Sequence, residues 1–415
     1  MCYPIFGGGI MKKQILSFMC SAMLLSACTT SSIHKLSNTT GSLSLKEAAI
    51  LDAGLVQNIN DLAFLIQDES SDKNVFMSSL SIYVALAMAS HGTAGNTYKQ
   101  FADLLIPANI DQAGWFDQLR ALQGNLNVQD PVIIKLANSL WMREDFKDKV
   151  KPAFLQRNQD YFGAMIAAMD FAKDSALDEI NGWVEKNTNN LIKKTLDKID
   201  PSTVMFLINT IYFKADWLNQ FDKAETKDGI FHGKTDVTVS YMNQTSSFNY
   251  YEDDAMQAIL LPYKGNKTGM VVVLGKDETA PITTSDMLNR LLDDMQSASV
   301  TLKLPKVDLA TKEILNDKLI AMGLSDAFTG GVADFSELSE DGDLYIAEVL
   351  HKARLMIDEK GTEAAAVTVI DIRETSIEIG DYEMTVDRPY QIFIVDLENK
   401  LILFNGIIQD VSAKE

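Results

Sequence analysis

The order of apolar and polar residues separates the chain into a helical part and a strand-rich part. From residue 45 to about residue 170, apolar residues recur mainly at the spacing of one helix face. LKEAAILDAGLVQNINDLAFLI at 45–66 follows this pattern, and SSLSIYVALAMASHGTAGNT at 78–97 predicts an almost wholly apolar helix that ends at Gly92. ALDEINGWVEKNTNNLI at 176–192 predicts another helix.

Beyond about Val204 the pattern becomes that of β-strands. VMFLINTIYF at 204–213 is a short apolar run typical of the centre of a sheet. AILLPYKGNKTGMVVVLG at 258–275 predicts two strands around a turn, and YQIFIVDLENKLILFNGII at 390–408 predicts a closing hairpin. The chain shows no internal repeat, and no linker rich in proline and glycine divides it. We therefore expect one large α+β domain over 45–415.

The composition allows a large core and argues against one class of partner. The chain has 415 residues, of which 47% are hydrophobic, so it can bury a substantial core. Its formal net charge is -20. Since nucleic acids are bound by clustered lysine and arginine, we expect no nucleic-acid partner.

The N-terminus carries an export signal. MKKQILSFMCSAMLLSAC starts at Met11 with two lysines and continues as an apolar run that is too short for a permanent membrane helix. We interpret 1–27 as a signal peptide and 1–10 as lying upstream of the true start. The end of the run, LSAC, resembles the bacterial lipobox, which predicts that Cys28 is lipidated. The alternative is an ordinary cleaved signal in which Cys28 has no role.

The cysteines exclude a disulfide framework. The chain has three, Cys2, Cys20 and Cys28, so no disulfide can form beyond Cys28 and the domain depends on its core for stability. The segment 29–44, TTSSIHKLSNTTGSLS, is rich in serine and threonine and shows no apolar period. We interpret it as a flexible tether.

Residues for catalysis or metal binding are sparse. The four histidines, His34, His91, His232 and His351, lack metal-ligand spacing, and we interpret all but His34 as structural. The chain has no G-x-S-x-G elbow, P-loop or dinucleotide fingerprint. We therefore expect no metal, no cofactor and no enzymatic activity.

One segment, EKGTEAAAVTVIDIRETSIEIG at 359–380, alternates like a strand but is built of small residues. Its side chains fall on two opposite faces, the first formed by Thr362, Ala364, Ala366 and Thr368 and the second by Glu363, Ala365 and Val367. A strand whose inner face carries only threonine and alanine buries too little apolar surface for a permanent core element. The pattern favours a strand that enters a sheet later.

Several longer motifs together resemble one family, the serpins, from about residue 47 to 412. The motifs are NVFMSSLSIYVALAMASHGTAGNT at 74–97, IIKLANSLW at 133–141, YFGAMIAAMDF at 161–171, INGWVEKNTNNLIKKTL at 180–196, LINTIYFKADWLNQFD at 207–222, LYIAEVLHKARLMIDEKGTEAAAVT at 344–368 and DRPYQIFI at 387–394. One departure is Ser79, where the family pattern SPLS has proline, and we expect a slightly changed helix start.

The resemblance implies a serpin fold with a mainly helical N-terminal half packed on a large central β-sheet, further sheets, and an exposed reactive loop at about 359–388. In inhibitory members a protease cleaves this loop and forms an acyl-enzyme. The hinge of the loop then inserts as a new strand and traps the protease. The implied hinge residues are Glu359, Gly361, Thr362, Glu363, Ala364, Ala365, Ala366 and Thr368.

The family's usual count places the cleaved bond at Thr375-Ser376, which implies elastase-like or broad-specificity targets. The alternative is Arg373-Glu374, since arginine suits trypsin-like proteases. The acidic residue after Arg373 is unfavourable for such an enzyme, and this bond would shorten the inserted strand by two residues. The loop is also about three residues longer than in a common member, which weakens the count.

The resemblance also implies residues that control opening of the central sheet. Lys306 and Trp217 match positions at the top of the sheet, where we expect Lys306 to pair with Glu359. Lower in the sheet, the matching positions form a group that we expect to lie close together: His351, Asn209, Ser78 and Ser81.

These observations favour an inhibitor of serine proteases, with cysteine proteases as a second target class, that acts as a monomer at a bacterial envelope. A non-inhibitory binding or chaperone-like lipoprotein is the alternative, and a lipid-anchored hydrolase is a third class for which the sequence offers no motif. We expect the protein to be exported and lipid-anchored. Thr29 is not the acidic residue often linked to inner-membrane retention, which favours the outer membrane.

Overall fold

The computed structural model describes most of the domain. The described residues are 34–35, 50–67, 73–127, 130–277, 281–341, 343–362 and 380–412. The folded unit begins at Ile33. The signal peptide, Cys28 and the segment 363–379 lie outside the described residues.

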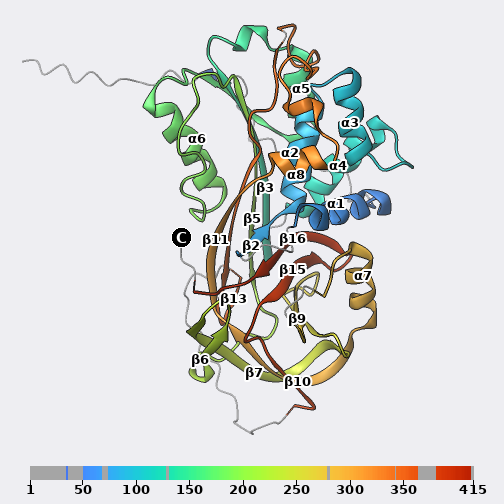
Figure 1. Ribbon diagram of the computed structural model, residues 1–415, viewed down its shortest axis with the longest axis vertical. Coiled ribbons are helices and arrows are strands. Elements are labelled where there is room, and N and C mark those ends of the chain that lie inside the picture. The colour runs from blue at the N-terminus through green and yellow to red at the C-terminus, as the bar shows by residue number, and fades with distance from the viewer. Residues whose placement is uncertain are drawn as a thin grey trace, which may run out of the picture. The chain divides into compact units, whose positions relative to one another are not determined.

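Eight α-helices are present in the described part of the chain. They are α1 (Ala53–Ile66), α2 (Ser79–Ser90), α3 (Gly95–Leu105), α4 (Gln112–Leu126), α5 (Pro152–Phe162), α6 (Asp174–Asn187), α7 (Ser285–Asp294) and α8 (Asn316–Ala321). Figure 1 shows α1 to α5 and α8 grouped at one end of the folded unit, with the strands β6, β7 and β10 at the other.

The strands form two sheets. They are β1 (His34–Lys35), β2 (Val75–Met77), β3 (Val132–Arg143), β4 (Met165–Met169), β5 (Met205–Asp216), β6 (Lys227–His232), β7 (Asp236–Glu252), β8 (Met256–Pro262), β9 (Thr268–Gly275), β10 (Gln296–Pro305), β11 (Val307–Ile314), β12 (Leu350–Ile357), β13 (Gly361–Thr362), β14 (Tyr382–Thr385), β15 (Tyr390–Asp396) and β16 (Leu401–Ile408). The first sheet, which we call the central sheet, has seven strands in the order β1-β4-β3-β5-β13-β12-β11.

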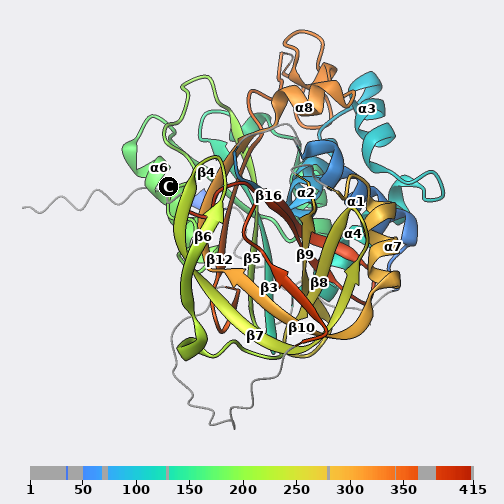
Figure 2. The same ribbon diagram turned by 60° about the horizontal axis from the view of Figure 1, so that its bottom comes forward.

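The second sheet has nine strands. Eight follow the order β14-β10-β7-β8-β9-β15-β16-β2, and β6 pairs with β7. Figure 2 shows the long strand β7 and its neighbour β10 curving past the end of β3 and β5. The predicted two strands at 258–275 are β8 and β9, and the predicted closing hairpin is β15 and β16. The predicted α+β architecture is thus confirmed for the described residues.

The core lies where α2 crosses between the two sheets. Eleven of the twelve residues of α2 are buried, which fits its almost wholly apolar sequence. The helix begins at Ser79, and the side chain of Ser78 caps it by accepting a hydrogen bond from the Ser81 N–H at 3.1 Å. The substitution of proline by Ser79 therefore leaves a capped helix.

Two sequence expectations need correction. The helical part also contains β3 and β4, and the strand-rich part contains α7 and α8. In addition, His34 and Lys35 pair with Ala168 and Ala167 of β4, so the interpretation of 29–44 as a flexible tether is wrong for these two residues. Within the described residues, no helix is both long enough and apolar enough to cross a membrane.

Candidate functional site

The hinge is partly inserted in the central sheet. The chain leaves β12 at Ile357 and turns back through a tight loop in which Asp358 N–H donates to the Gly361 carbonyl at 3.0 Å. β13 then pairs with β12 on one side, through Ile357 and Thr362, and with β5 on the other. The expectation of a wholly exposed loop from residue 359 is therefore wrong for Glu359, Gly361 and Thr362, which are buried.

Gly361 is required at this position by close packing. It lies opposite Asp216 in β5, and a Cβ atom added to it would collide with the backbone carbonyl oxygen of Ala215. No side chain can occupy that space without moving one of the two strands. The role of Gly361 is to let β13 approach β5 closely.

Thr362 is held by an aromatic pair beneath the sheet. Its side chain is 5% exposed, and its hydroxyl lies 2.5 Å from the hydroxyl of Tyr263. Tyr263 stacks on Trp217 with ring centroids 4.6 Å apart and an interplanar angle of 8°. The indole N–H of Trp217 donates to the carbonyl of Asp358 at 2.9 Å, so this pair connects the hinge turn to β13.

Glu359 forms the expected ion pair with Lys306. The Lys306 Nζ lies 2.8 and 3.0 Å from the two carboxylate oxygens of Glu359, and the Thr226 hydroxyl donates to the same carboxylate at 2.9 Å. Burial raises the pKa of the Glu359 carboxyl, but hydrogen bonds from Lys306, from its own backbone and from Thr226 outweigh this effect, so the pKa is lowered. The carboxylate is 6% exposed and stays ionised near neutral pH.

A second group of polar side chains lies between β5 and β12, further from the hinge turn. The Ser78 N–H donates to His351 Nε2 at 3.1 Å, and the Ser81 hydroxyl donates to the amide oxygen of Asn209. His351 and Asn209 belong to β12 and β5 and are connected through the start of α2. Burial lowers the pKa of His351 to about 4, so its imidazole is neutral and accepts the hydrogen bond.

The polar group around His351 and Asn209 includes more residues than the sequence indicated. Asn209 Nδ2 donates to Asn138 Oδ1 on β3 at 2.6 Å. Asn138 in turn donates to Gln123 on α4 at 2.8 Å and to the Phe162 carbonyl at 2.7 Å. Asn138 lies within the IIKLANSLW motif, and an amide side chain between apolar neighbours was the available signal. Tyr263 and Thr226 carried no such signal.

β5 and β12 do not pair with each other. In the described residues, β5 pairs with β3 and β13, and β12 pairs with β11 and β13. β13 is only two residues long, so both neighbours continue beyond it for most of their length.

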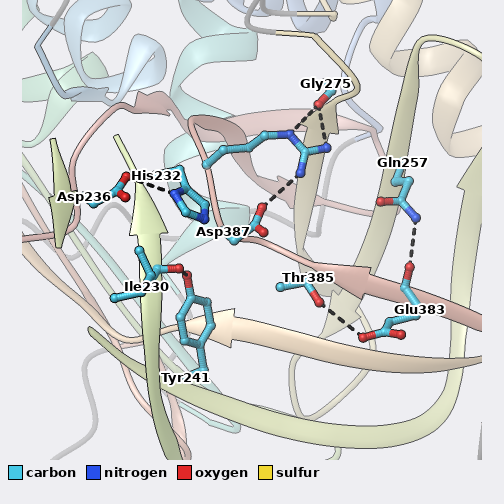
Figure 3. Close-up of polar contacts among 10 residues, drawn as sticks. Ile230, His232, Asp236, Tyr241, Gln257, Gly275, Glu383, Thr385 and Asp387 are labelled. Carbon is cyan, nitrogen blue, oxygen red and sulfur yellow. Dashed lines mark hydrogen bonds and ion pairs between the residues drawn. The ribbon is translucent and has the colours of Figure 1, made fainter. Parts of the chain in front are cut away.

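The chain beyond the loop is fixed to the second sheet. β14 pairs in parallel with β10, and Gly380 N–H donates to the Thr301 hydroxyl at 3.2 Å. Figure 3 shows the next residues, where the Arg388 guanidinium donates twice to the Gly275 carbonyl, at 3.0 and 3.1 Å, and once to Asp387. The His232 N–H donates to the Asp387 carbonyl at 2.6 Å. Both ends of the segment 363–379 are therefore held by the domain.

The remaining site residues cannot be placed. Glu363, Ala364, Ala365, Ala366 and Thr368 lie outside the described residues. So do the two candidate bonds and the lipidation residue, which are Thr375-Ser376, Arg373-Glu374 and Cys28. Within the described residues, no group of three His, Cys, Asp or Glu side chains could hold a metal ion.

The remaining histidines are placed by the structure. His91 is buried and stacks on Phe116 with ring centroids 3.8 Å apart. His232 is exposed, with its Nδ1 atom 2.9 Å from Asp236 Oδ1, so it is not a core residue (Figure 3).

Comparison with known proteins identifies the fold family. The family model "Serpin (serine protease inhibitor)" matches residues 59–411. The leukocyte elastase inhibitor of Equus caballus is 32% identical, over 83% of this chain and 95% of the inhibitor. The native thermophilic serpin tengpin has a TM-score of 0.78 and 30% identity, over 88% of this chain and 96% of tengpin.

The family also includes a protein that binds a small ligand. Thyroxine-binding globulin, solved in complex with thyroxine, has a TM-score of 0.75 and 28% identity, over 86% of this chain and 99% of the globulin. Serpins are mostly protease inhibitors rather than enzymes, and the globulin shows that the fold also serves binding. The family match and these likenesses show that the chain belongs to the serpin family.

Proposed function

We propose that the protein is a suicide inhibitor of serine endopeptidases, with cysteine endopeptidases as a second target class. The observation that carries this proposal is β13, a two-residue strand placed between β5 and β12, which do not pair with each other. After cleavage, the chain beyond Thr362 would extend this strand and carry the attached protease with it. The loop would thus trap the acyl-enzyme before it is hydrolysed.

The pairs of β13 fix the register of such an extension. Thr362 lies opposite Ala215 and Ile357. An antiparallel continuation would place Thr368 between Asn209 of β5 and His351 of β12, at the buried polar group. Its hydroxyl would meet hydrogen-bonding partners there, while the alanines at 364 and 366 would pass apolar neighbours.

Extension of the strand would release enough free energy to drive the trap. About a dozen residues would each gain roughly 1 kcal/mol of net hydrogen bonding, which gives on the order of 10 kcal/mol. This is comparable to the stability of an ordinary domain. No proline lies between Glu359 and Arg388, so the ladder would not be interrupted.

We further propose that the loop is cleaved at Thr375-Ser376 by an elastase-like or broad-specificity protease. The similarity to a leukocyte elastase inhibitor supports this choice. Arg373-Glu374 remains the alternative for a trypsin-like target. We propose that the protein is a monomer attached to the outer membrane by a lipid on Cys28, which the lipobox-like LSAC sequence supports.

Incubation with proteases tests the proposed function directly. The mature protein should form a covalent adduct with an elastase-like enzyme that survives denaturing electrophoresis, and mass spectrometry of the released C-terminal fragment should identify Ser376 as its first residue. Release of a fragment that begins at Glu374 would instead assign the bond to Arg373. Cleavage without any adduct would favour the non-inhibitory alternative, in which the protein binds a ligand or client as thyroxine-binding globulin binds thyroxine.

A charge at Thr362 should convert the inhibitor into a substrate. In Thr362→Arg a charge would be buried against Tyr263, at several kcal/mol when unpaired, so we expect β13 to leave the sheet even before cleavage. Tryptophan fluorescence should change in the intact variant because Trp217 stacks on Tyr263. The loop should be cut at the same bond, with loss of the adduct.

The neighbouring residue provides the matched control. Side chains alternate along a strand, so Glu363→Arg should point away from the core and keep most of the adduct yield. Thr362→Ser, which retains a hydroxyl for Tyr263, should behave like the wild type. Equal loss of adduct in the two arginine variants would contradict the alternation.

Removal of the Thr368 hydroxyl should weaken the inserted state alone. In Thr368→Val the inserted strand would lose the hydrogen bond of this hydroxyl to the buried polar group, which is worth about 0.5–1.5 kcal/mol. The stability of the cleaved form in guanidinium should fall, while the intact protein should be unchanged. The control Thr375→Val lies beyond the region opposite β5 and should leave the cleaved form unchanged. If Thr368→Val stabilises the cleaved form, the register is wrong.

Acid should loosen the region around His351. Its pKa is about 4 in the native state and about 6.5 when exposed, so the exposed state binds more protons between these pH values. The stability that depends on neutral His351 is complete above pH 6.5 and is lost as the pH falls toward about 4, by about 3 kcal/mol in total. Buried His91, with a pKa lowered to about 3 by burial and nearby Arg157, acts in the same direction.

The two histidines can be separated by substitution. The unfolding midpoint of the wild type in urea should fall between pH 7.5 and pH 5. His351→Gln should show a smaller fall, and His351→Ala should also polymerise faster on warming because the contact to Ser78 is lost. If His91→Gln, and not His351→Gln, removes the pH dependence, the effect arises outside the central sheet.

A further inference from the structure

The N-terminal segment closes the outer edge of the central sheet. β1 pairs antiparallel with β4, with His34 opposite Ala168 and Lys35 opposite Ala167. The sequence of β4, MIAAM, contains no charged residue or proline, which are the usual means of protecting an edge strand. Both faces of β4 are packed, since Ala168 belongs to the main core and Ala167 to the cluster beneath α6. Backbone pairing is thus the interaction that this edge can offer.

The strand register places β1 far from the hinge. His34 lies opposite Ala168, Ala168 opposite Met142, and Met142 opposite Met205 of β5. Thr362 of the hinge pairs with Ala215, at the other end of β5. The ten residue-to-residue steps from Met205 to Ala215 span about 33 Å in a strand. Figure 1 shows β13 at the opposite end of the sheet from α5.

The strand directions show on which side the chain enters β1. β5 runs toward the hinge, β3 is antiparallel to β5, and β4 is parallel to β3. β1 is antiparallel to β4 and therefore runs toward the hinge. The chain consequently enters β1 at His34 from the side facing away from the hinge.

We propose that β1 is a docking strand that orients the protein on its membrane, with the reactive loop facing away from the lipid. This inference rests on the lipid anchor proposed at Cys28. Five residues lie between Cys28 and His34, so the six Cα–Cα steps that join them can span at most about 22 Å. With β1 docked, this short connection holds the end of the sheet opposite the hinge near the lipid. The loop then stands at least the length of β5 further out, where a protease can reach it.

Paired cysteines test the docking without reference to inhibition or lipidation. The mature chain has no cysteine other than Cys28, so in a soluble Cys28→Ser background the only thiols are the introduced ones. The two matched pairs are His34→Cys with Ala168→Cys and Lys35→Cys with Ala167→Cys. The pair whose Cβ atoms lie closer together should form a disulfide. The crossed control, His34→Cys with Ala167→Cys, places the thiols on opposite faces and should stay reduced. Absence of a disulfide in both matched pairs would overturn the docking.

Energy transfer tests the orientation in the lipidated protein on vesicles that carry an acceptor lipid. A label on Asp145→Cys, just beyond β3 at the end away from the hinge, should transfer strongly, and one on Asn219→Cys, beside the hinge, should transfer weakly. His34→Pro with Lys35→Pro, which removes the donors of β1, should abolish the difference. Equal transfer from both labels in the wild type would overturn the orientation. Failure of the anchor would instead appear as loss of vesicle binding, with the disulfide result unchanged.

Discussion

The central sheet depends on a bridge of two residues. β13 (Gly361–Thr362) is the only described strand that pairs with both β5 and β12, and it fits because Gly361 has no side chain and Thr362 places its hydroxyl on Tyr263. The Glu359–Lys306 ion pair fixes the turn just before the bridge.

The polar group lower in the sheet is the counterpart of the bridge. Buried polar groups are favourable only when they are hydrogen-bonded, and this group is satisfied through α2, β3 and α4 rather than across the sheet. Between the bridge and this group, the described residues show no pairing of β5 with β12. Under the proposed function, an extended β13 would pair with both strands there.

The sequence predicted the fold well, because long motifs and periodic patterns report on burial. The resemblance predicted the Lys306–Glu359 pair, which the structure contains. The alternation along 362–368 stays a prediction, because the residues after Thr362 lie outside the described part of the chain. It could not predict how far the hinge is inserted, because that depends on a fit between Gly361 and Ala215 across 146 residues of chain. Nor could it predict β1, since two polar residues in a serine-rich segment pair through backbone atoms that carry no sequence signal.

The partial insertion also bears on the speed of trapping. Bringing a loop into a sheet is slowest at its first contacts, because chain entropy is lost before many hydrogen bonds form. In this protein the first pairs, Gly361 with Asp216 and Thr362 with Ala215 and Ile357, already exist before any cleavage. Each later residue would add next to an existing pair. Under the proposed function, insertion would therefore begin as propagation of a strand rather than as its initiation, which would favour trapping in the competition with hydrolysis of the acyl-enzyme.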